Sequence, residues 1–227
     1  MEANVAQPAA LIGDPTRAAI LMALLGDRTM PATALAWAAG VSAQSASNHL
    51  ARLVDGGLLT VTARGRHRYY RLAGAHVAQA LESLAVLGPA PRALELPCTP
   101  KARRLREART CYDHLAGMLA VALADAMELD GLIEVDGPKT LRLTERGAER
   151  LIEIGVEAGD LAGRPCIDWT ERRRHLAGPL GRVLLTRFLA LGWVVRGKES
   201  RAIEVTAAGR RGLRDVFGVD LETARAA

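Results

Sequence analysis

Five residues in the second half of the chain have side chains that bind soft cations or react as thiols. They are Cys111, His114, Cys166, Asp168 and His175. Cys111 and His114 are three residues apart and would share one face of a helix. If the two segments face one another, the side chains could converge on a soft metal ion, a metalloid or a thiol–disulfide switch. The alternative is a structural role, because a buried cysteine usually behaves as a small apolar residue.

An internal repeat would bring these two segments together. His114-Leu115-Ala116-Gly117 recurs 61 residues later as His175-Leu176-Ala177-Gly178, and the repeats extend over about 111–159 and 166–220. One copy could not bury its apolar face alone, so we expect two copies to pack about a pseudo-twofold axis. Each copy is predicted to be a helix, a hairpin and a second helix, with turns near Asp136-Gly137 and Gly197-Lys198 and caps at Thr144 and Thr206.

A second set of polar residues, nearer the N-terminus, has side chains that suit the reading of base edges. A helix over Ala43–Asp55 would bury Ala46, Leu50, Leu53 and Val54 and turn a polar face outward. Asparagine and glutamine can bond to adenine, arginine to guanine, and serine to a base or a phosphate. The candidate DNA-binding residues are Ser42, Gln44, Ser45, Ser47, Asn48 and Arg52 on this segment, and Arg64, Arg66, His67 and Arg68 on the next. Each feature alone is also common on ordinary solvated surfaces.

The elements that must position these residues follow a recognisable order. Asp14-Pro15 opens a helix that ends near Gly26, a second helix fits Pro31–Ala39, and Gly40-Val41-Ser42 turns into the helix Ala43–Asp55. Two β-prone segments, 58–62 and 68–72, then form a hairpin with a basic tip around Gly65. This order predicts a winged helix-turn-helix. The next helix, Ala75–Leu87, has an apolar face that a second copy of the chain would cover.

Composition and charge limit the function classes. The chain has 227 residues, 49% of them hydrophobic, and no uninterrupted apolar segment long enough to span a membrane, so we expect a cytoplasmic protein. Three cysteines are too few for a disulfide framework. The net charge of +5 divides into +3 for 1–72, +3 for 73–109 and −1 for 110–227, so a polyanion should meet the N-terminal half. The basic stretch Lys101–Arg109 is either a second DNA contact or a solvated helix.

These patterns predict a mainly α fold with small β-hairpins, an α+β chain of two domains. Residues 1–88 would form the DNA-binding and dimerisation domain, 89–109 a linker with a basic helix, and 110–227 a C-terminal effector domain of two repeats. Another reading of the C-terminal half is an organic-ligand pocket lined by aromatic residues, although so few aromatics favour a role in the core. These residues are Tyr112, Trp169, Trp193 and Phe217.

The N-terminal segment resembles the ArsR/SmtB type of winged-helix regulator over about residues 10–87. The matching runs are Gly13-Asp14-Pro15-Thr16-Arg17, Ile20-Leu21, Val41-Ser42, Asn48-His49-Leu50, Leu53, Gly56-Gly57-Leu58, Gly65-Arg66 and Tyr70-Arg71-Leu72. The resemblance implies a homodimeric repressor that occupies an inverted-repeat operator in double-stranded DNA and leaves it when an effector binds. It implies dimerisation through the N-terminal segment and the helix Ala75–Leu87.

The chain departs from that family at the metal sites that many members carry. Pro31–Ala39 contains no cysteine, and the helix Ala75–Leu87 offers only His76 and Glu82 as ligands. No metal site is therefore carried over by the resemblance, and no cofactor is required for DNA binding. Two other functions stay open: an enzyme in the C-terminal half targeted by a DNA-binding module, and a nucleoid protein without sequence preference. We find no phosphate-binding glycine loop, HExxH motif or nucleophile motif that would favour the enzyme.

Overall fold

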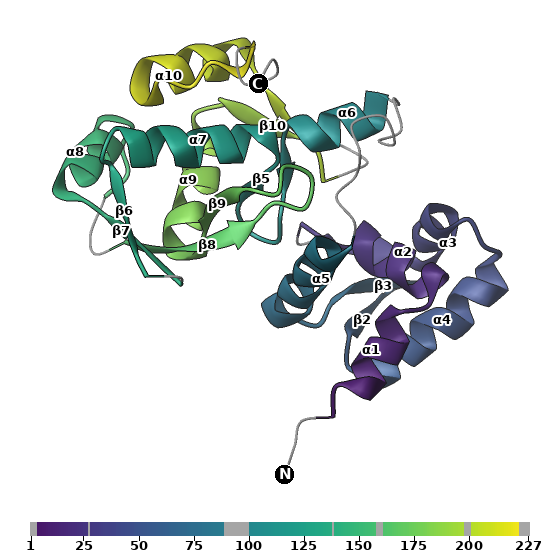
Figure 1. Ribbon diagram of the computed structural model, residues 1–227. Coiled ribbons are helices and arrows are strands. Elements are labelled where there is room, and N and C mark those ends of the chain that lie inside the picture. The colour runs from purple at the N-terminus through teal and green to yellow at the C-terminus, as the bar shows by residue number, and fades with distance from the viewer. Residues whose placement is uncertain are drawn as a thin grey trace. The chain divides into compact units, whose positions relative to one another are not determined.

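The computed structural model divides the chain into two compact units, Met1–Leu81 and Glu82–Ala227. It describes residues 4–26, 28–88, 100–137, 139–157, 161–197 and 201–222 (Figure 1). Residues 89–99, with Cys98, are the first part of the predicted linker 89–109 and lie outside the described residues, as does Lys198 of the second predicted hairpin turn. None of the described helices is long and apolar enough to cross a membrane.

The first unit is the predicted winged helix-turn-helix. Its core contains Ile20, Leu24, Leu35, Leu50 and Leu53, each with no exposed surface. The elements are α1 (Ala6–Ile12), α2 (Pro15–Ala23), β1 (Met30–Pro31), α3 (Ala32–Ala39), α4 (Ala43–Asp55), β2 (Leu59–Arg64), β3 (His67–Leu72) and the start of α5 (Ala75–Leu87). The three strands form one antiparallel sheet in the order β1-β3-β2. The sequence pattern did not predict α1, which has no side-chain cap and buries no residue.

Capping residues explain where the helices of the first unit begin and end. Asp14 Oδ1 accepts a hydrogen bond of 2.9 Å from the Arg17 amide at the start of α2, and Ser42 Oγ accepts one of 3.2 Å from the Ser45 amide at the start of α4. Gly40 ends α3 with a φ of 66°, a left-handed conformation that favours glycine. The short turn between α3 and α4 is therefore fixed at both ends.

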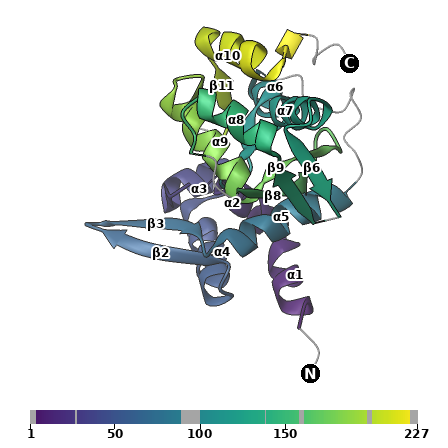
Figure 2. The same ribbon diagram turned by 90° about the vertical axis from the view of Figure 1, so that its left-hand side faces the viewer.

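Strands β2 and β3 form the wing. Their register runs from Leu59 opposite Leu72 to Arg64 opposite His67, with Gly65 in the turn at a φ of 59°. Leu59 and Leu72 are buried at the base of the hairpin, whereas residues 61–68 are exposed. Figure 2 shows the two strands projecting beyond the helices of this unit.

The second unit contains more β-sheet than the two hairpins that the sequence predicts. Its elements are α6 (Pro100–Glu107), β4 (Arg109–Thr110), β5 (Leu115–Ala116), α7 (Met118–Leu129), β6 (Ile133–Asp136), β7 (Thr140–Leu143), α8 (Glu145–Glu153), β8 (Ala162–Ile167), β9 (Arg174–Ala177), α9 (Gly178–Ala190), β10 (Val194–Arg196), β11 (Ile203–Val205) and α10 (Ala207–Phe217). The sheets are β6-β7-β8-β9, β4-β5 and β10-β11. Strand β8 contains Gly163 and Pro165, which weaken any strand pattern.

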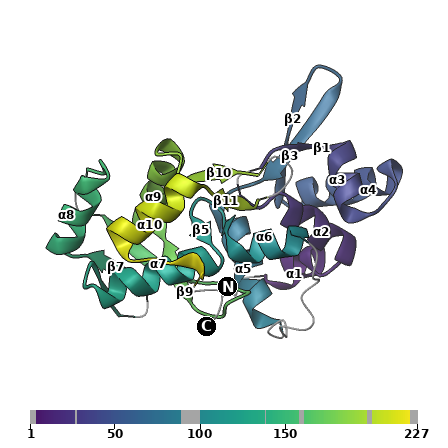
Figure 3. The same cartoon turned by 90° about the horizontal axis from the view of Figure 1, so that it is seen from above.

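The core of the second unit lies between its helices and sheets. Phe188 on α9 is fully buried, with Phe217 of α10 edge-on at a ring-centroid distance of 5.9 Å and Trp193 stacked at 5.3 Å. Leu119 and Met127 of α7 are buried in the same cluster. Figure 3 shows α10 near both α7 and α9. Trp193 and Phe217 therefore pack in the hydrophobic core.

Candidate nucleic-acid interface and cysteine–histidine cluster

The outward face of α4 carries the polar residues that the sequence predicts. Ala46, Leu50 and Leu53 are buried, which turns the opposite side of the helix to solvent. Ser42 caps the helix, so its hydroxyl already accepts one backbone hydrogen bond. Ser42, Gln44, Ser47, Asn48 and Arg52 are exposed and Ser45 is half-buried. An exposed face of this composition can present bidentate groups to base edges in a major groove.

The wing carries an exposed cationic tip. Arg64, Arg66, His67 and Arg68 are all exposed. The Arg64 guanidinium lies 5.6 Å from the centre of the Tyr69 ring, where a cation–π contact holds it along the hairpin. Such a tip can contact phosphates or enter a minor groove.

The basic stretch Lys101–Arg109 is only partly available to DNA. It forms α6 over most of its length, as one of the two readings expected. Arg106 pairs with Glu171 at 3.0 Å and Arg104 with Glu204 at 3.5 Å. Arg109 is fully buried, so a DNA contact by this residue is excluded.

The structure brings together four of the five residues with metal or thiol chemistry. The ligand atoms of Cys111, His114, Cys166 and His175 all lie within 4.8 Å of one another. Cys111, His114 and His175 are 3%, 2% and 1% exposed, and Cys166 is half-buried. The four side chains come from two segments about sixty residues apart, so only the folded second unit assembles them.

Two different structures position the residues of this cysteine–histidine cluster. Strand pairing positions Cys166 and His175, and a tight loop positions Cys111 and His114. Cys166 on β8 stands directly opposite His175 on β9, so both side chains project from one face of the sheet. Cys111 and His114 lie in the loop between β4 and β5, where the Cys111 amide donates a 3.0 Å hydrogen bond to the His114 carbonyl. The expectation that these two share a helical face was wrong, because Thr110 pairs with Leu115 and the helix begins only at Met118.

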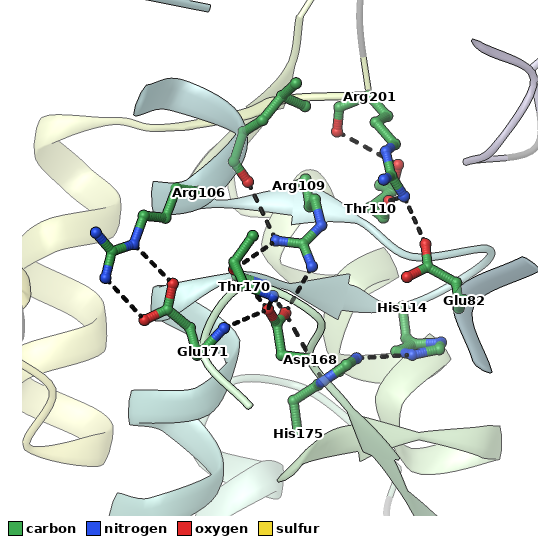
Figure 4. A network of polar contacts seen from close by, with 12 residues as sticks. Glu82, Arg106, Arg109, Thr110, His114, Asp168, Thr170, Glu171, His175 and Arg201 are labelled. Carbon is green, nitrogen blue, oxygen red and sulfur yellow. Dashed lines mark hydrogen bonds and ion pairs between the residues drawn. The ribbon is translucent and has the colours of Figure 1, made fainter. Parts of the chain in front are cut away.

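The two imidazole rings of the cluster contact each other (Figure 4). His114 Nε2 lies 3.2 Å from His175 Nε2, and the ring centroids are 5.1 Å apart. The outer nitrogens face carboxylates: His114 Nδ1 lies 3.0 Å from Asp113 Oδ1, and His175 Nδ1 lies 4.0 Å from Asp168 Oδ2. Within the described part of the chain, His175 Nδ1 has no hydrogen-bond partner. Each histidine thus directs one nitrogen into the cluster and the other toward an acid.

Asp168, the fifth predicted residue, supports the cluster from outside. Its Oδ2 accepts hydrogen bonds from Arg109 at 2.8 Å and from the Gly117 amide at 2.6 Å. Its Oδ1 accepts from the Thr170 amide and hydroxyl and from the Glu171 amide. Burial acts to raise the pKa of Asp168, but Arg109 and these donors outweigh it and hold that pKa far below its ordinary value.

The electrostatics of the cluster favour one thiolate. A hydrogen bond from Cys111 lowers the pKa of the Cys166 thiol despite its burial, and contacts with both histidines lower it further. The same hydrogen bond, together with burial, raises the pKa of Cys111. Burial acts to lower the pKa of His114, but hydrogen bonds to Asp113 and Cys166 raise it overall. A thiolate held beside two imidazoles is the form in which cysteine binds metal.

Sequence analysis did not assign three further residues, Arg109, Asp113 and Arg182, to this cluster. Arg109 pairs with Asp168, and Arg182 contacts Asp113 at 2.6 Å. Asp113 supports His114, and the contact with His114, followed by that with Arg182, lowers the pKa of Asp113 to about 2. The one available signal was the acid two residues after each of the two cysteines of the cluster, Asp113 after Cys111 and Asp168 after Cys166.

Comparison with known proteins identifies relatives along almost the whole chain. The Helix-turn-helix domain family matches residues 12–62. The uncharacterized HTH-type transcriptional regulator YdfF of Bacillus subtilis (strain 168) is 37% identical over 217 residues, which are 92% of this chain and 95% of that protein. The HTH-type transcriptional regulator CmtR of Mycobacterium bovis is 40% identical over 83 residues, 37% of this chain and 70% of that protein.

Among solved structures, the chain is similar to an N-terminal fragment of Mb0332 from Mycobacterium bovis. That structure is described as a homodimeric winged helix-turn-helix DNA-binding domain of a possible ArsR-family transcriptional regulator. The match has 32% identity and a TM-score of 0.34, and covers 37% of this chain and 76% of that one. With an identity of 37% across nearly all of the YdfF chain, and with the winged helix described above, this chain belongs to the HTH-type transcriptional regulators.

Proposed function

We propose that the chain is a homodimeric repressor that binds an inverted-repeat operator and leaves it when an effector binds to the C-terminal half. The observation that carries this proposal is the exposed polar face of α4 beside the exposed cationic wing, in a chain of this regulator family. The reader and dimerisation domain would comprise 1–88, with 89–109 as the linker and 110–227 as the effector domain.

Sequence reading is assigned to α4 and phosphate binding to the wing. Gln44 and Asn48 are one helical turn apart and both exposed, which suits two neighbouring bases on one strand. Arg52 continues the same face by a further turn. The exposed arginines of β2 and β3 would contact the backbone next to the groove that α4 occupies.

Dimerisation is assigned to α1 and α5. No residue of α1 is buried within its own chain, and the last turns of α5 expose Leu84 by 44% and Leu87 by 80%. A second copy would cover these apolar side chains about a twofold axis. The twofold symmetry of the protein would then match the symmetry of an inverted repeat.

The effector domain is proposed to consist of two copies of one helix–hairpin–helix repeat. Helices α7 and α9 are each followed by a hairpin and a capped helix. Thr144 Oγ1 accepts from the Gly147 amide and donates to the Gly131 carbonyl, and Thr206 Oγ1 makes the same two bonds with Gly209 and Gly192. Strand β8, before the second copy, pairs with β7 of the first, and Arg109, before the first copy, bridges to Ala202 of the second. Each copy thus pairs with the segment that precedes the other copy, which supports a pseudo-twofold arrangement.

The test is a comparison of DNA affinities for the full-length protein at physiological salt. We expect the protein to bind the DNA upstream of its own gene at least about a thousandfold more tightly than random DNA of equal length. Equal affinities would contradict a specific regulator and favour the nucleoid-protein alternative. Analysis of the operator complex by size-exclusion chromatography with light scattering should give two chains per duplex.

A further inference from the structure

We propose that Cys111, His114, Cys166 and His175 form a tetrahedral site for one Zn²⁺ ion, and that Zn²⁺ is the effector that releases the DNA. The second half of this inference rests on the function proposed above, whereas the binding of Zn²⁺ does not. The site is distinct from the helix positions at which many family members carry metal ligands, because α3 has no cysteine and α5 offers only His76 and Glu82.

The donor set selects the metal. Two thiolates and two imidazoles favour a tetrahedral borderline-soft cation such as Zn²⁺, whereas Mg²⁺ and Ca²⁺ require oxygen ligands in larger number. The four donor atoms come from four different side chains and lie within 4.8 Å of one another, which is the arrangement of a closed four-ligand site.

The distance between the histidine nitrogens fits zinc coordination. With Zn–N bonds of about 2.05 Å and a tetrahedral angle, two imidazole nitrogens should be about 3.3 Å apart. The Nε2 atoms of His114 and His175 are 3.2 Å apart. A direct hydrogen bond between them in the free protein needs one protonated and one unprotonated nitrogen, and Zn²⁺ would replace that proton by binding both lone pairs.

The surroundings of the two histidines are those of metal ligands. A metal-bound histidine commonly donates its second N–H to a carboxylate, which orients the ring and makes it a stronger ligand. Asp113 lies beside His114 Nδ1, and Asp168 lies 4.0 Å from His175 Nδ1, an otherwise unsatisfied nitrogen of a side chain that is 1% exposed. An acid behind each ring is the arrangement expected around two zinc-bound histidines.

The same observations favour zinc over a disulfide switch. A disulfide between Cys111 and Cys166 would use the two sulfur atoms alone, whereas a Zn²⁺ ion would also bind both histidine Nε2 atoms. Cys166 is half-buried, whereas the other three ligands are almost fully buried, so Cys166 is the most exposed of the four.

A short chain of contacts links the site to α5 within the second unit. Thr110 precedes Cys111, and its amide donates a 2.9 Å hydrogen bond to the Arg201 carbonyl. The Arg201 guanidinium binds Glu82 of α5 at 2.5 Å, and both side chains are almost fully buried (Figure 4). Closure of the loop at Cys111 around an ion would act on Thr110, and through Arg201 on the helix assigned to dimerisation.

The binding test uses the reduced, metal-free full-length protein and Zn²⁺ in competition with a chromophoric chelator. We expect one Zn²⁺ per chain, an affinity at least 100-fold lower in Cys166→Ser and Cys111→Ser, and a 10- to 100-fold loss in Asp113→Asn. Cys98→Ser and His76→Gln are the matched controls and should bind as the parent does. Unchanged affinity in the Cys111 and Cys166 variants overturns the site.

Co²⁺ gives a measurement that needs no variant. Bound to the parent protein, it should show the thiolate-to-metal charge-transfer absorption and the intense visible bands of tetrahedral cobalt, and Zn²⁺ should abolish both. A spectrum of octahedral Co²⁺ without thiolate absorption would overturn the proposal even if a variant failed to fold.

The effector role is tested separately on the operator complex. Zn²⁺ should lower the operator affinity of the parent by at least about tenfold and leave that of Cys166→Ser unchanged. If Zn²⁺ binds at the four residues and the operator affinity stays the same, the effector role is wrong while the metal site stands. If the protein binds no operator at all, the proposed function fails, and the zinc and cobalt measurements still decide the site.

Discussion

Arg109 and Asp168 form an ion pair of 2.8 Å in which both side chains are completely buried. The pair joins β4 to the loop that follows β8, and so holds together the two segments that carry the cysteine–histidine cluster. The Arg109 guanidinium also lies 5.0 Å from the centre of the Trp169 ring and donates to Thr170 Oγ1. Every oxygen of the Asp168 carboxylate accepts at least two hydrogen bonds. The pair is therefore a structural support of the cluster.

Substitution of Asp168 by asparagine should destabilise the second unit by about 3–5 kcal/mol, because it leaves the Arg109 charge buried without a counter-ion. The asparagine amide group would also face the Gly117 amide or the Thr170 amide, both of which are donors. Urea unfolding of the full-length protein, followed by the fluorescence of Trp169 and Trp193, measures this loss.

Asp125→Asn is the matched control for that measurement. Asp125 and Arg173 form an ion pair of the same length, 2.8 Å, but their side chains are 43% and 62% exposed. We expect a change below about 1 kcal/mol, since solvent screens an exposed pair. Equal losses in the two variants would show that burial of the Arg109–Asp168 pair has no consequence for stability.

Asn48→Ala and Gln44→Ala should each weaken binding to the operator by about 1–3 kcal/mol and leave binding to random DNA unchanged. Both side chains are exposed on α4 and neither contributes to the core, so the fold should be kept. Fluorescence anisotropy with the two duplexes measures the difference. Glu149→Ala, an exposed polar change on α8, is the control and should bind both duplexes as the parent does. Parallel losses on both duplexes would assign α4 to backbone contacts.

Arg66→Ala should weaken binding to operator and random DNA alike and reduce the slope of log K against log salt by about 0.9, the value for one phosphate contact. Arg66 is exposed at the tip of the wing, next to Gly65. Arg146→Ala removes an exposed arginine of α8 and should leave the slope as it is. An unchanged slope in Arg66→Ala would exclude a phosphate role for the tip.

The winged helix-turn-helix was predictable from the sequence because its caps and turns depend on residues that are close together in the chain. Asp14 and Ser42 are caps within three residues of the amides that they accept from, and Gly65 stands in the turn between two β-prone segments. The helices Ala43–Asp55 and Ala75–Leu87 have the predicted bounds. Helix α1 was missed because it has neither a cap nor a buried face.

The residues of the cysteine–histidine cluster were named from sequence, but their arrangement was not. Strands β4 and β5 are two residues long, and such short segments have no periodicity to read. The helical spacing of Cys111 and His114 was therefore misleading. The buried pairing of Arg109 with Asp168 joins residues 59 apart, and a basic stretch gives no sign that one of its arginines is internal.

Two glycines, Gly147 and Gly209, lie at equivalent places in the proposed repeats. A Cβ atom at Gly147 would lie 2.0 Å from the Leu132 carbonyl oxygen, and one at Gly209 would lie 2.0 Å from the Trp193 carbonyl oxygen. Helices α8 and α10 therefore approach the preceding hairpins more closely than any residue with a side chain allows. Gly147→Ala and Gly209→Ala should each destabilise the second unit by about 1–3 kcal/mol through overpacking.

Without such contacts, replacing a glycine inside a helix by alanine should increase the free energy of unfolding by about 1 kcal/mol. A decrease in Gly147→Ala and Gly209→Ala therefore distinguishes overpacking from this ordinary helix preference. Urea unfolding of the full-length variants provides the measurement, with Arg211→Ala, an exposed change on α10, as the control that should stay within about 0.5 kcal/mol. A stabilised Gly147→Ala or Gly209→Ala would contradict the close approach of helix and hairpin. A large loss at one glycine and none at the other would count against the equivalence of the two repeats, because the same backbone contact would then have unequal weight in the two halves.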